Sequence, residues 1–275
     1  MQDASPITIQ RWALGQIANS AQDMVAIEEP IEFRVDGQSV AISMRTPGHD
    51  VELAIGFLVS EGIVKNPSDI LEIARCANAR ESDNILNIFL SPNARPDLSR
   101  LSRHLFASSS CGICGKASID AIEQLFPPVS VCFQVKGESL FQMALQMRSN
   151  QQLFENSGAV HAAALFHHSG QLLVLREDVG RHNALDKVIG WAFQQKLLPL
   201  HSHILFVSGR TSFEIMQKAL SAGIGFIAAV SGPSSLAVAF AKSNNQTLLG
   251  FVRDKSFNIY SVPARVAGAL NCSNS

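Results

Sequence analysis

The sequence predicts an α/β protein, with a small α+β part at its amino-terminal end and a larger layered α/β part after it. Residues 31–90 follow the order strand, strand, helix, strand, strand, whereas residues 140–252 alternate helices with strands. Such alternation indicates a sheet covered by helices, with largely parallel strands. Hydrophobic residues make up 47% of the 275 residues and charged residues 16%, so the chain can bury a substantial core. We therefore expect two domains, over residues 1–135 and 136–275.

The amino-terminal domain is expected to hold four strands and one helix. Asp36-Gly37 separates two alternating segments, as in a β-hairpin with a two-residue turn. Val51–Glu61 has a helical pattern that ends at Gly62, because glycine readily adopts the left-handed conformation that follows a helix. The strands are expected at Ile31–Val35, Ser39–Ser43, Ile70–Cys76 and Ile85–Leu90. This order of elements predicts a small domain of β-grasp type.

The carboxyl-terminal domain is expected to hold five strands and four helices. The strands are expected at Ala159–Phe166, Gln171–Arg176, Ile204–Val207, Phe226–Val230 and Leu248–Val252, and the helices at Leu140–Phe154, Asp178–Phe193, Ser212–Ala222 and from Pro233 onward. Thr211-Ser-Phe-Glu214 fits a capping box at the start of its helix, and Gly223 fits a C-cap at the end. Pro233 suits the first position of the last helix.

Bulk properties exclude several classes of function. The formal net charge is −1, so no global basic field favours nucleic acid or an anionic membrane. The first residues lack the basic and apolar regions of a signal peptide, and the apolar runs are far shorter than the ~20 residues that span a bilayer. Five cysteines are too few and too scattered for a disulfide framework. We therefore expect a cytoplasmic protein that binds neither nucleic acid nor membrane.

Cys111-Gly-Ile-Cys114 is the sharpest functional signal. Two thiols three positions apart can share a metal, form a disulfide, or lower the pKa of one thiol so that it attacks as a thiolate. They lie in the Ser108–Gly115 loop, before a helix predicted over Ala117–Phe126. A structural zinc site would need two more ligands, and the other three cysteines are isolated along the chain. The pattern favours redox or sulfur-transfer chemistry, while metal binding and an inert pair stay open.

Two polar segments run from the end of a predicted strand into the start of a helix. They are Asp178–Asn183, which contains Arg181 and His182, and Ser208–Glu214, which contains Arg210. The free N–H groups at a helix start favour an anion, and ligands settle at the carboxyl ends of strands in α/β domains. The alternative is a solvated helix face. His161 is expected to hydrogen-bond within its strand rather than bind a metal.

The sequence resembles the formate dehydrogenase accessory sulfurtransferases, the FdhD family. The matching segments are Thr46–Phe57, Ser109–Gly115, Gly158–Ala163, Arg176–Lys187, Val207–Glu214 and Phe257–Ser261. They follow one another through nearly the whole chain, which is far more specific than a single pair of cysteines. The resemblance implies a protein that receives sulfur from a cysteine desulfurase and delivers it to the molybdenum (or tungsten) bis(molybdopterin guanine dinucleotide) cofactor of formate dehydrogenase.

The resemblance also implies roles for individual residues. Cys111 is the expected persulfide cysteine, with Cys114 as its partner. The cofactor-binding segment corresponds to Phe257, Asn258, Ile259, Tyr260, Ser261 and Val262. The carboxyl-terminal domain is implied to be cytidine-deaminase-like, but the two helix starts that carry zinc ligands in deaminases have no cysteine here. We therefore expect no structural zinc, and a guanine nucleotide bound around Arg181, His182 and Arg210.

The partners implied are a cysteine desulfurase, formate dehydrogenase and a second copy of the chain in a homodimer. A rival interpretation is a chaperone without catalytic activity, which holds the cofactor while its cysteines bind a metal. A zinc deaminase is disfavoured because the Pro-Cys-x-x-Cys pattern is absent.

Overall fold

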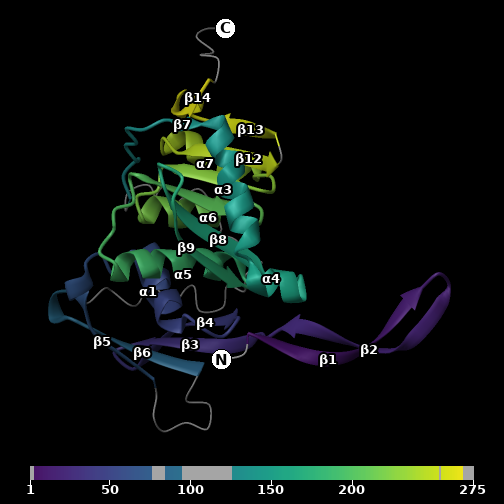
Figure 1. Cartoon of the computed structure of the whole chain (residues 1–275). Coiled ribbons are helices and arrows are strands. Elements are labelled where there is room, and N and C mark those ends of the chain that lie inside the picture. The colour runs from purple at the N-terminus through teal and green to yellow at the C-terminus, as the bar shows by residue number, and fades with distance from the viewer. Residues whose placement is uncertain (1–2, 76–83, 95–125, 254, 269–275) are drawn as a thin grey trace.

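The computed structural model of the protein describes residues 3–75, 84–94, 126–253 and 255–268. Figure 1 shows three parts: a layered body, a smaller sheet at one end of it, and a hairpin that projects from the base of that sheet. Cys111, Cys114 and nearly all of the helix predicted over residues 117–126 lie outside the described residues.

A six-stranded sheet with the order β13-β12-β11-β10-β8-β9 forms the centre of the body. Its strands are β8 (His161–His167), β9 (Leu172–Asp178), β10 (His203–Val207), β11 (Phe226–Ala229), β12 (Thr247–Arg253) and β13 (Ser256–Ser261). Only β10, β11 and β12 run parallel, and the other three pairings are antiparallel. The prediction of a largely parallel sheet is therefore wrong. β9 and β13 each follow their partner after a connection too short for a parallel crossover.

Helices cover both faces of this sheet, as the alternation predicted. Leu140, Met143 and Met147 of α3 pack on one face, against Ala164 and Phe166 of β8. The opposite face packs against three helices, α5 (Arg181–Gln194), α6 (Phe213–Ser221) and α7 (Ser235–Ser243). The helix predicted over Leu140–Phe154 is two helices, α3 (Gly137–Ser149) and α4 (Gln152–Ser157), since the chain turns at Asn150 and Gln151.

The smaller sheet has the order β4-β3-β6-β5 and packs against α1. Its elements are β3 (Glu29–Val35), β4 (Gln38–Arg45), α1 (Asp50–Ser60), β5 (Ile70–Arg75) and β6 (Ile85–Leu90). The predicted order of strands and helix is confirmed. The turn is also confirmed, because Asp36 and Gly37 both have positive φ, of 47° and 83°. The larger hydrophobic cluster contains residues of β3, α1, α5 and α6 together, so the domain boundary at residue 135 stays a prediction.

Three local predictions about helix starts are wrong. Thr211 and Glu214 form no capping box. The N-cap of α6 is Ser212, whose side chain makes no capping hydrogen bond, and the Glu214 carboxylate pairs with His182 instead. Asp178 ends β9 rather than beginning a helix. Pro233 lies before α7, whose N-cap is Ser234, because the Ser234 hydroxyl accepts a hydrogen bond from the N–H of Ala237.

Helices α1 and α5 cross at backbone contact through one glycine from each. A Cβ atom on Gly56 would overlap the carbonyl oxygen of Asp186, and one on Gly190 would overlap that of Glu52. Backbone atoms cannot move aside as the end of a flexible side chain can. Glycine at both positions is therefore what allows the smaller sheet, through α1, to join the body.

Charged groups reinforce this junction. Glu52 on α1 accepts two hydrogen bonds from Arg176 on β9, at 2.6 and 2.8 Å. Burial alone would raise the pKa of Glu52, but the hydrogen bonds from Arg176 and His49 lower it to about 2. Lys218 of α6 lies 2.8 Å from the buried carboxylate of Asp186, and Ser60 of α1 lies 2.7 Å from the same side chain. Glu52 and Asp186 at this junction therefore each have an opposite charge within hydrogen-bond distance.

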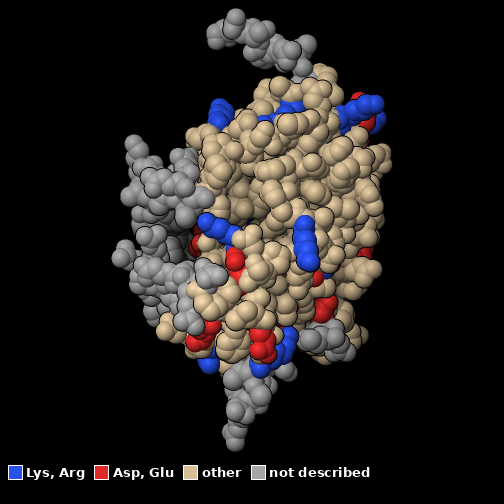
Figure 2. Space-filling model, turned by 90° about the vertical axis from the view of Figure 1, so that its left-hand side faces the viewer, with Lys and Arg blue, Asp and Glu red and all other residues tan. Residues whose placement is uncertain are grey.

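The surface carries no broad region of one sign on the face that Figure 2 displays. Lysine and arginine groups alternate there with aspartate and glutamate groups in small clusters, and other residues cover most of the area. None of the helices among the described residues is long and apolar enough to cross a membrane.

We expect Gly190→Ala to destabilise the protein by about 3 kcal/mol or more, because its methyl group would push α5 away from α1. Gly137→Ala is the matched control: its Cβ would meet only the Phe257 ring, at 3.6 Å, an ordinary van der Waals contact. Urea unfolding followed by circular dichroism measures both. Equal midpoints for the two variants would show that the helices do not depend on this crossing.

Candidate functional site

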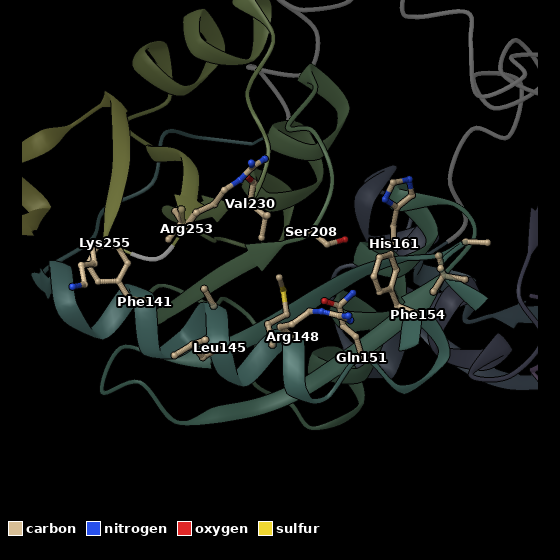
Figure 3. Close-up of a pocket in the computed structure, with 16 residues that line it drawn as sticks. Phe141, Leu145, Arg148, Gln151, Phe154, His161, Ser208, Val230, Arg253 and Lys255 are labelled. Atoms are coloured by element: carbon tan, nitrogen blue, oxygen red, sulfur yellow. The ribbon is translucent and has the colours of Figure 1, made fainter. Parts of the chain in front are cut away.

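A cavity of about 950 Å³ lies between α3 and the carboxyl ends of β10, β11 and β12. Figure 3 shows Phe141 and Lys255 at one end, and Phe154 and His161 at the other. Its middle is apolar, and its basic groups come from α3, from β12 and from the connection after β12. The lining residues are Phe141, Ala144, Leu145, Met147, Arg148, Gln151, Phe154, Gly158, Ala159, Val160, His161, Ser208, Val230, Val252, Arg253 and Lys255.

The end of the cavity near His161 is shaped by a close contact with the loop after β10. A Cβ atom on Gly209 would lie 3.1 Å from His161 Nδ1 and 3.7 Å from Arg181 Cβ. The neighbouring Ser208 accepts a hydrogen bond at its hydroxyl from the N–H of Ala162, at 2.8 Å. Gly209 therefore separates the cavity from the start of α5 by little more than the thickness of the backbone.

A polar cluster lies on the other side of Gly209, where α5 and α6 begin. His182 Nε2 lies 2.8 Å from Glu214 Oε2 and 3.3 Å from Ser212 Oγ. The hydrogen bond from His182 is the main cause that lowers the pKa of Glu214, against the opposing effect of burial. Glu214 is thus held as a carboxylate that orients the His182 ring.

The charge around His161 favours its neutral form. Burial lowers the pKa of His161, and the positive charges of Arg181, His182 and Arg210 lower it further. His161 was expected to hydrogen-bond within its strand. It is the first residue of β8, so the strand position is confirmed, and it also lines the cavity. A neutral imidazole at a cavity wall can accept a hydrogen bond from a ligand.

The start of α5 is fixed by a buried ion pair. Lys187 Nζ lies 2.7 Å from Asp178 Oδ2, and both side chains are almost completely buried. Asp178 also accepts hydrogen bonds from the N–H groups of Thr46 and Gly180 and from Asn183 Nδ2. The ion pair therefore holds the turn before α5, which presents Arg181 and His182, against the loop that precedes α1.

Two buried polar atoms in this region lack a partner among the described residues: Arg181 Nε and Thr211 Oγ1. Arg181 begins α5, where the first N–H groups of the helix are also free. A guanidinium with an unused N–H next to a helix start is a group that an anion can satisfy.

The segment predicted to bind the cofactor, Phe257–Val262, lies apart from the polar cluster. It forms the edge strand β13, which is three strand spacings, about 14 Å, from β10. Phe257 packs against Phe141, a residue of the cavity wall, with ring centroids 5.7 Å apart. The structure therefore brings this segment to the opposite end of the cavity from Arg181, His182 and Arg210.

Side chains along this strand alternate between the two sheet faces. Phe257 and Ile259 pack with the α3 side, whereas Tyr260 packs with the larger core. Ser261 is buried and structural, since its hydroxyl lies 2.7 Å from the carbonyl oxygen of Gln246 and accepts from the N–H of Leu248. Asn258 Nδ2 donates to the Tyr260 hydroxyl at 3.3 Å. Val262 follows in the left-handed conformation at φ 48°, a strained state for a β-branched residue.

The sequence predicted a site at Arg181, His182 and Arg210 because these residues follow strand ends. In the structure, the starts of the two helices that these residues precede or begin lie close together. Glu214 was missed as a site residue, because its spacing from Thr211 matched a capping box. Arg253 and Lys255 were also missed, since a strand end and a short connection give no periodic signal. Cys111 and Cys114 lie outside the described residues, and their roles stay predictions.

Within the described residues, no group of three or more histidine, cysteine, aspartate or glutamate side chains has the geometry to hold a metal ion. Cys132, which is exposed and free, is the one cysteine of the five that falls in the described ranges. His182 and Glu214 pair where α5 and α6 begin.

We expect the His161 imidazole to titrate below 6.5, and the substitution Arg181→Gln to raise its midpoint by removing a nearby positive charge. Because the pKa is lowered in the folded protein, the stability contributed by neutral His161 is present above pH 6.5 and is lost as pH falls below it. NMR titration of the imidazole signals measures the midpoint, with His161→Gln to assign it. Arg181→Lys keeps the charge and should leave the midpoint low; an equal rise in both variants contradicts the electrostatic cause.

Comparison with known proteins agrees with this architecture. The model of the FdhD/NarQ family matches residues 26–267. Three curated relatives, each named sulfur carrier protein FdhD, come from Mycolicibacterium paratuberculosis (46% identical, over 97% of this chain and all of the relative), Streptomyces coelicolor (46%, over 89% of each) and Sulfolobus acidocaldarius (41%, over 90% and 92%). A crystal structure of a proposed formate dehydrogenase accessory protein from Desulfotalea psychrophila shares the fold, with a TM-score of 0.77 and 23% identity over 96% of this chain and all of that one. This chain belongs to the FdhD/NarQ family.

Proposed function

We propose that this protein is a sulfur carrier for the maturation of formate dehydrogenase. In this proposal Cys111 accepts persulfide sulfur from a cysteine desulfurase and passes it to a molybdenum or tungsten bis(molybdopterin guanine dinucleotide) cofactor, with Cys114 as its partner. The names of the curated relatives and the position of the cysteine pair within the family segments support the carrier role. The observation that carries the choice of acceptor is the cavity, in which Arg148, Arg253 and Lys255 stand around an apolar middle.

The size and lining of the cavity suit a ligand of this kind. A volume of about 950 Å³ is at the upper end of the range for small-molecule sites. The aromatic and aliphatic walls between Phe141 and Phe154 offer contact to flat rings such as guanine or a pterin. Arg148, Arg253 and Lys255 stand around this apolar middle, where they could pair with phosphate oxygens.

The polar cluster would receive the anionic part of the ligand. Arg181 and His182 begin a helix, so their side-chain donors add to the free backbone N–H groups and the positive end of the helix dipole. Arg210 is exposed at the neighbouring strand end and lowers the pKa of His161 through its charge, which indicates that it lies nearby. Phosphates bound here would balance the positive charge that, together with burial, lowers the pKa of His161.

An elongated dinucleotide would suit two groups of binding residues that lie on separate strands, since Arg210 follows β10 and Phe257–Val262 begins on β13, three strand spacings or about 14 Å away. One end of the ligand would reach the polar cluster beside Gly209, and the other would reach the connection between β12 and β13 near Phe257. A small mononucleotide would contact only one of these ends.

Sulfur loading is expected on Cys111. Incubation with a cysteine desulfurase and cysteine should add one sulfur to the intact mass of the protein, because the Cys111 thiolate would attack the outer sulfur of the donor's cysteine persulfide, whose S–S bond breaks as the donor cysteine leaves as a thiolate. Cys111→Ser should abolish the gain, and Cys132→Ser, which removes an exposed thiol, should leave it unchanged. A mass gain in Cys111→Ser equal to that of the unchanged protein contradicts the assignment; bound metal without added sulfur would favour the chaperone role instead.

Guanine nucleotide binding is expected to depend on the polar cluster. Arg210→Ser should weaken binding of GDP about 10-fold or more, because a charged hydrogen bond to phosphate is lost. Lys242→Ser is the control, since Lys242 is an exposed lysine at the end of α7, away from the cavity. Calorimetry at low and moderate salt measures both dissociation constants. GDP binding that Arg210→Ser leaves unaltered would place the nucleotide elsewhere.

A further inference from the structure

The last three residues of β9 each contact a different helix. Arg176 pairs with a glutamate of α1, and Asp178 pairs with a lysine of α5. Glu177, between them, contacts α4: its Oε2 accepts a hydrogen bond from the N–H of Leu153 at 2.8 Å, and its Oε1 accepts one from the N–H of Phe154 at 2.9 Å. The end of one strand therefore fixes α1, α4 and α5 relative to the sheet.

Helix α4 lacks the local features that usually fix the start of a helix. It is six residues long (Gln152–Ser157), and a helix this short is marginal by itself in water. The side chain of its N-cap residue, Gln151, makes no capping hydrogen bond. The Glu177 carboxylate supplies the cap from β9 instead, since it accepts two of the first free N–H groups and lies at the positive end of the helix dipole.

Phe154, whose own N–H bonds to Glu177, joins α4 to the cavity. The guanidinium carbon of Arg148 lies over the Phe154 ring, 4.7 Å from its centroid, in a cation–π contact. Both side chains line the cavity (Figure 3). Arg148 also pairs with Glu155 of α4, at 2.9 Å. The position of α4 therefore determines where an aromatic ring and a guanidinium meet at the cavity wall.

The same strand end places His161, another side chain at this end of the cavity. In the antiparallel pairing of β8 with β9, His161 is opposite Asp178, and Ala162 is opposite Glu177. A ligand at this end would thus meet Phe154 and His161 at a separation that the end of β9 determines.

We propose that Glu177 is a positioning residue of the cavity. Its carboxylate fixes the ring of Phe154 and, through that ring, the guanidinium of Arg148, so that the two side chains together receive a planar ring that carries a phosphate. Planar rings stack on aromatic and guanidinium faces, and guanidinium N–H groups bind phosphate oxygens. Glu177 does not itself line the cavity, so it acts through α4. The inference rests on the proposed function, because it concerns how the same cavity holds a nucleotide.

Hydrogen exchange tests the positioning step without a ligand. Glu177→Gln removes the charge and replaces one accepting oxygen with an NH2 group, so one N–H of α4 loses its partner. The amides of Leu153 and Phe154 should exchange about 10-fold faster or more, whereas those of α5 should keep their protection. Unchanged exchange in α4 overturns the proposal, and so does an equal acceleration in α5, which would indicate a general loss of stability.

Calorimetry with GDP as the probe tests the consequence for binding. Glu177→Gln should weaken GDP binding about 10-fold, because the ring and the guanidinium are no longer held in place before the ligand arrives. Asp69→Asn is the matched control. Asp69 also accepts two backbone N–H groups beside a short 3₁₀ helix (Pro67–Asp69), those of Lys65 and Asn66, but it lies away from the cavity. GDP affinity in this variant should equal that of the unchanged protein.

A double-mutant cycle decides whether Glu177 acts through Phe154. Phe154→Leu alone should weaken GDP binding about 10-fold, and adding Glu177→Gln should weaken it no further, since no ring is left to position. A combined loss of about 100-fold, the product of two independent effects, overturns the proposal. GDP binding that Glu177→Gln leaves unaltered overturns this inference alone, whereas an unchanged protein that binds no GDP overturns it together with the proposed nucleotide site.

Discussion

The contact between α1 and α5 is the constraint on which the rest of the structure depends. Two glycines, Gly56 and Gly190, let the helix backbones touch, and no other residue type would fit either position without moving a helix. Because the helices are so close, charged side chains from one part of the chain reach partners in the other, as Glu52 reaches Arg176. The smaller sheet and the body are thus joined through backbone contact and paired charges as well as through a shared core.

This junction also determines how the candidate site is presented. Asp186 lies at the crossing, where Lys218 and Ser60 contact its carboxylate. The next residue, Lys187, pairs with Asp178, which ends β9 just before α5. The turn before α5 is therefore fixed from both sides. Arg181 and His182, which follow that turn, emerge at a defined position beside the cavity rather than on a loose helix end.

Most elements could be predicted because their signals are local. The turn at Asp36-Gly37 and the helix end at Gly62 depend on backbone conformations that few residues adopt, and both were recognised. The antiparallel pairing of β8 with β10 could not be derived in this way, since periodicity identifies a strand and not its partner. The pairing of Glu214 with His182 could not be predicted, because the two residues are 32 positions apart in the sequence. The spacing of Glu214 from Thr211 also suggested a capping box, a local role for the same carboxylate. The hairpin of β1 (Ala4–Ala13) and β2 (Gln16–Ala26) was not predicted at all, because it buries little and so lacks a regular apolar face.

The anion binding that we propose for the site would follow from a local imbalance of charge in a nearly neutral chain. Asp178 pairs with Lys187 and Glu214 pairs with His182, so both carboxylates near Arg181 and Arg210 already have a cationic or hydrogen-bonding partner. His161 completes the set by remaining neutral, since a further proton there would add to the positive charges that already surround it. An anionic ligand would relieve this imbalance, and its arrival would make His161 easier to protonate. The protonation state of His161 would therefore depend on whether an anionic ligand occupies the cavity that His161 lines.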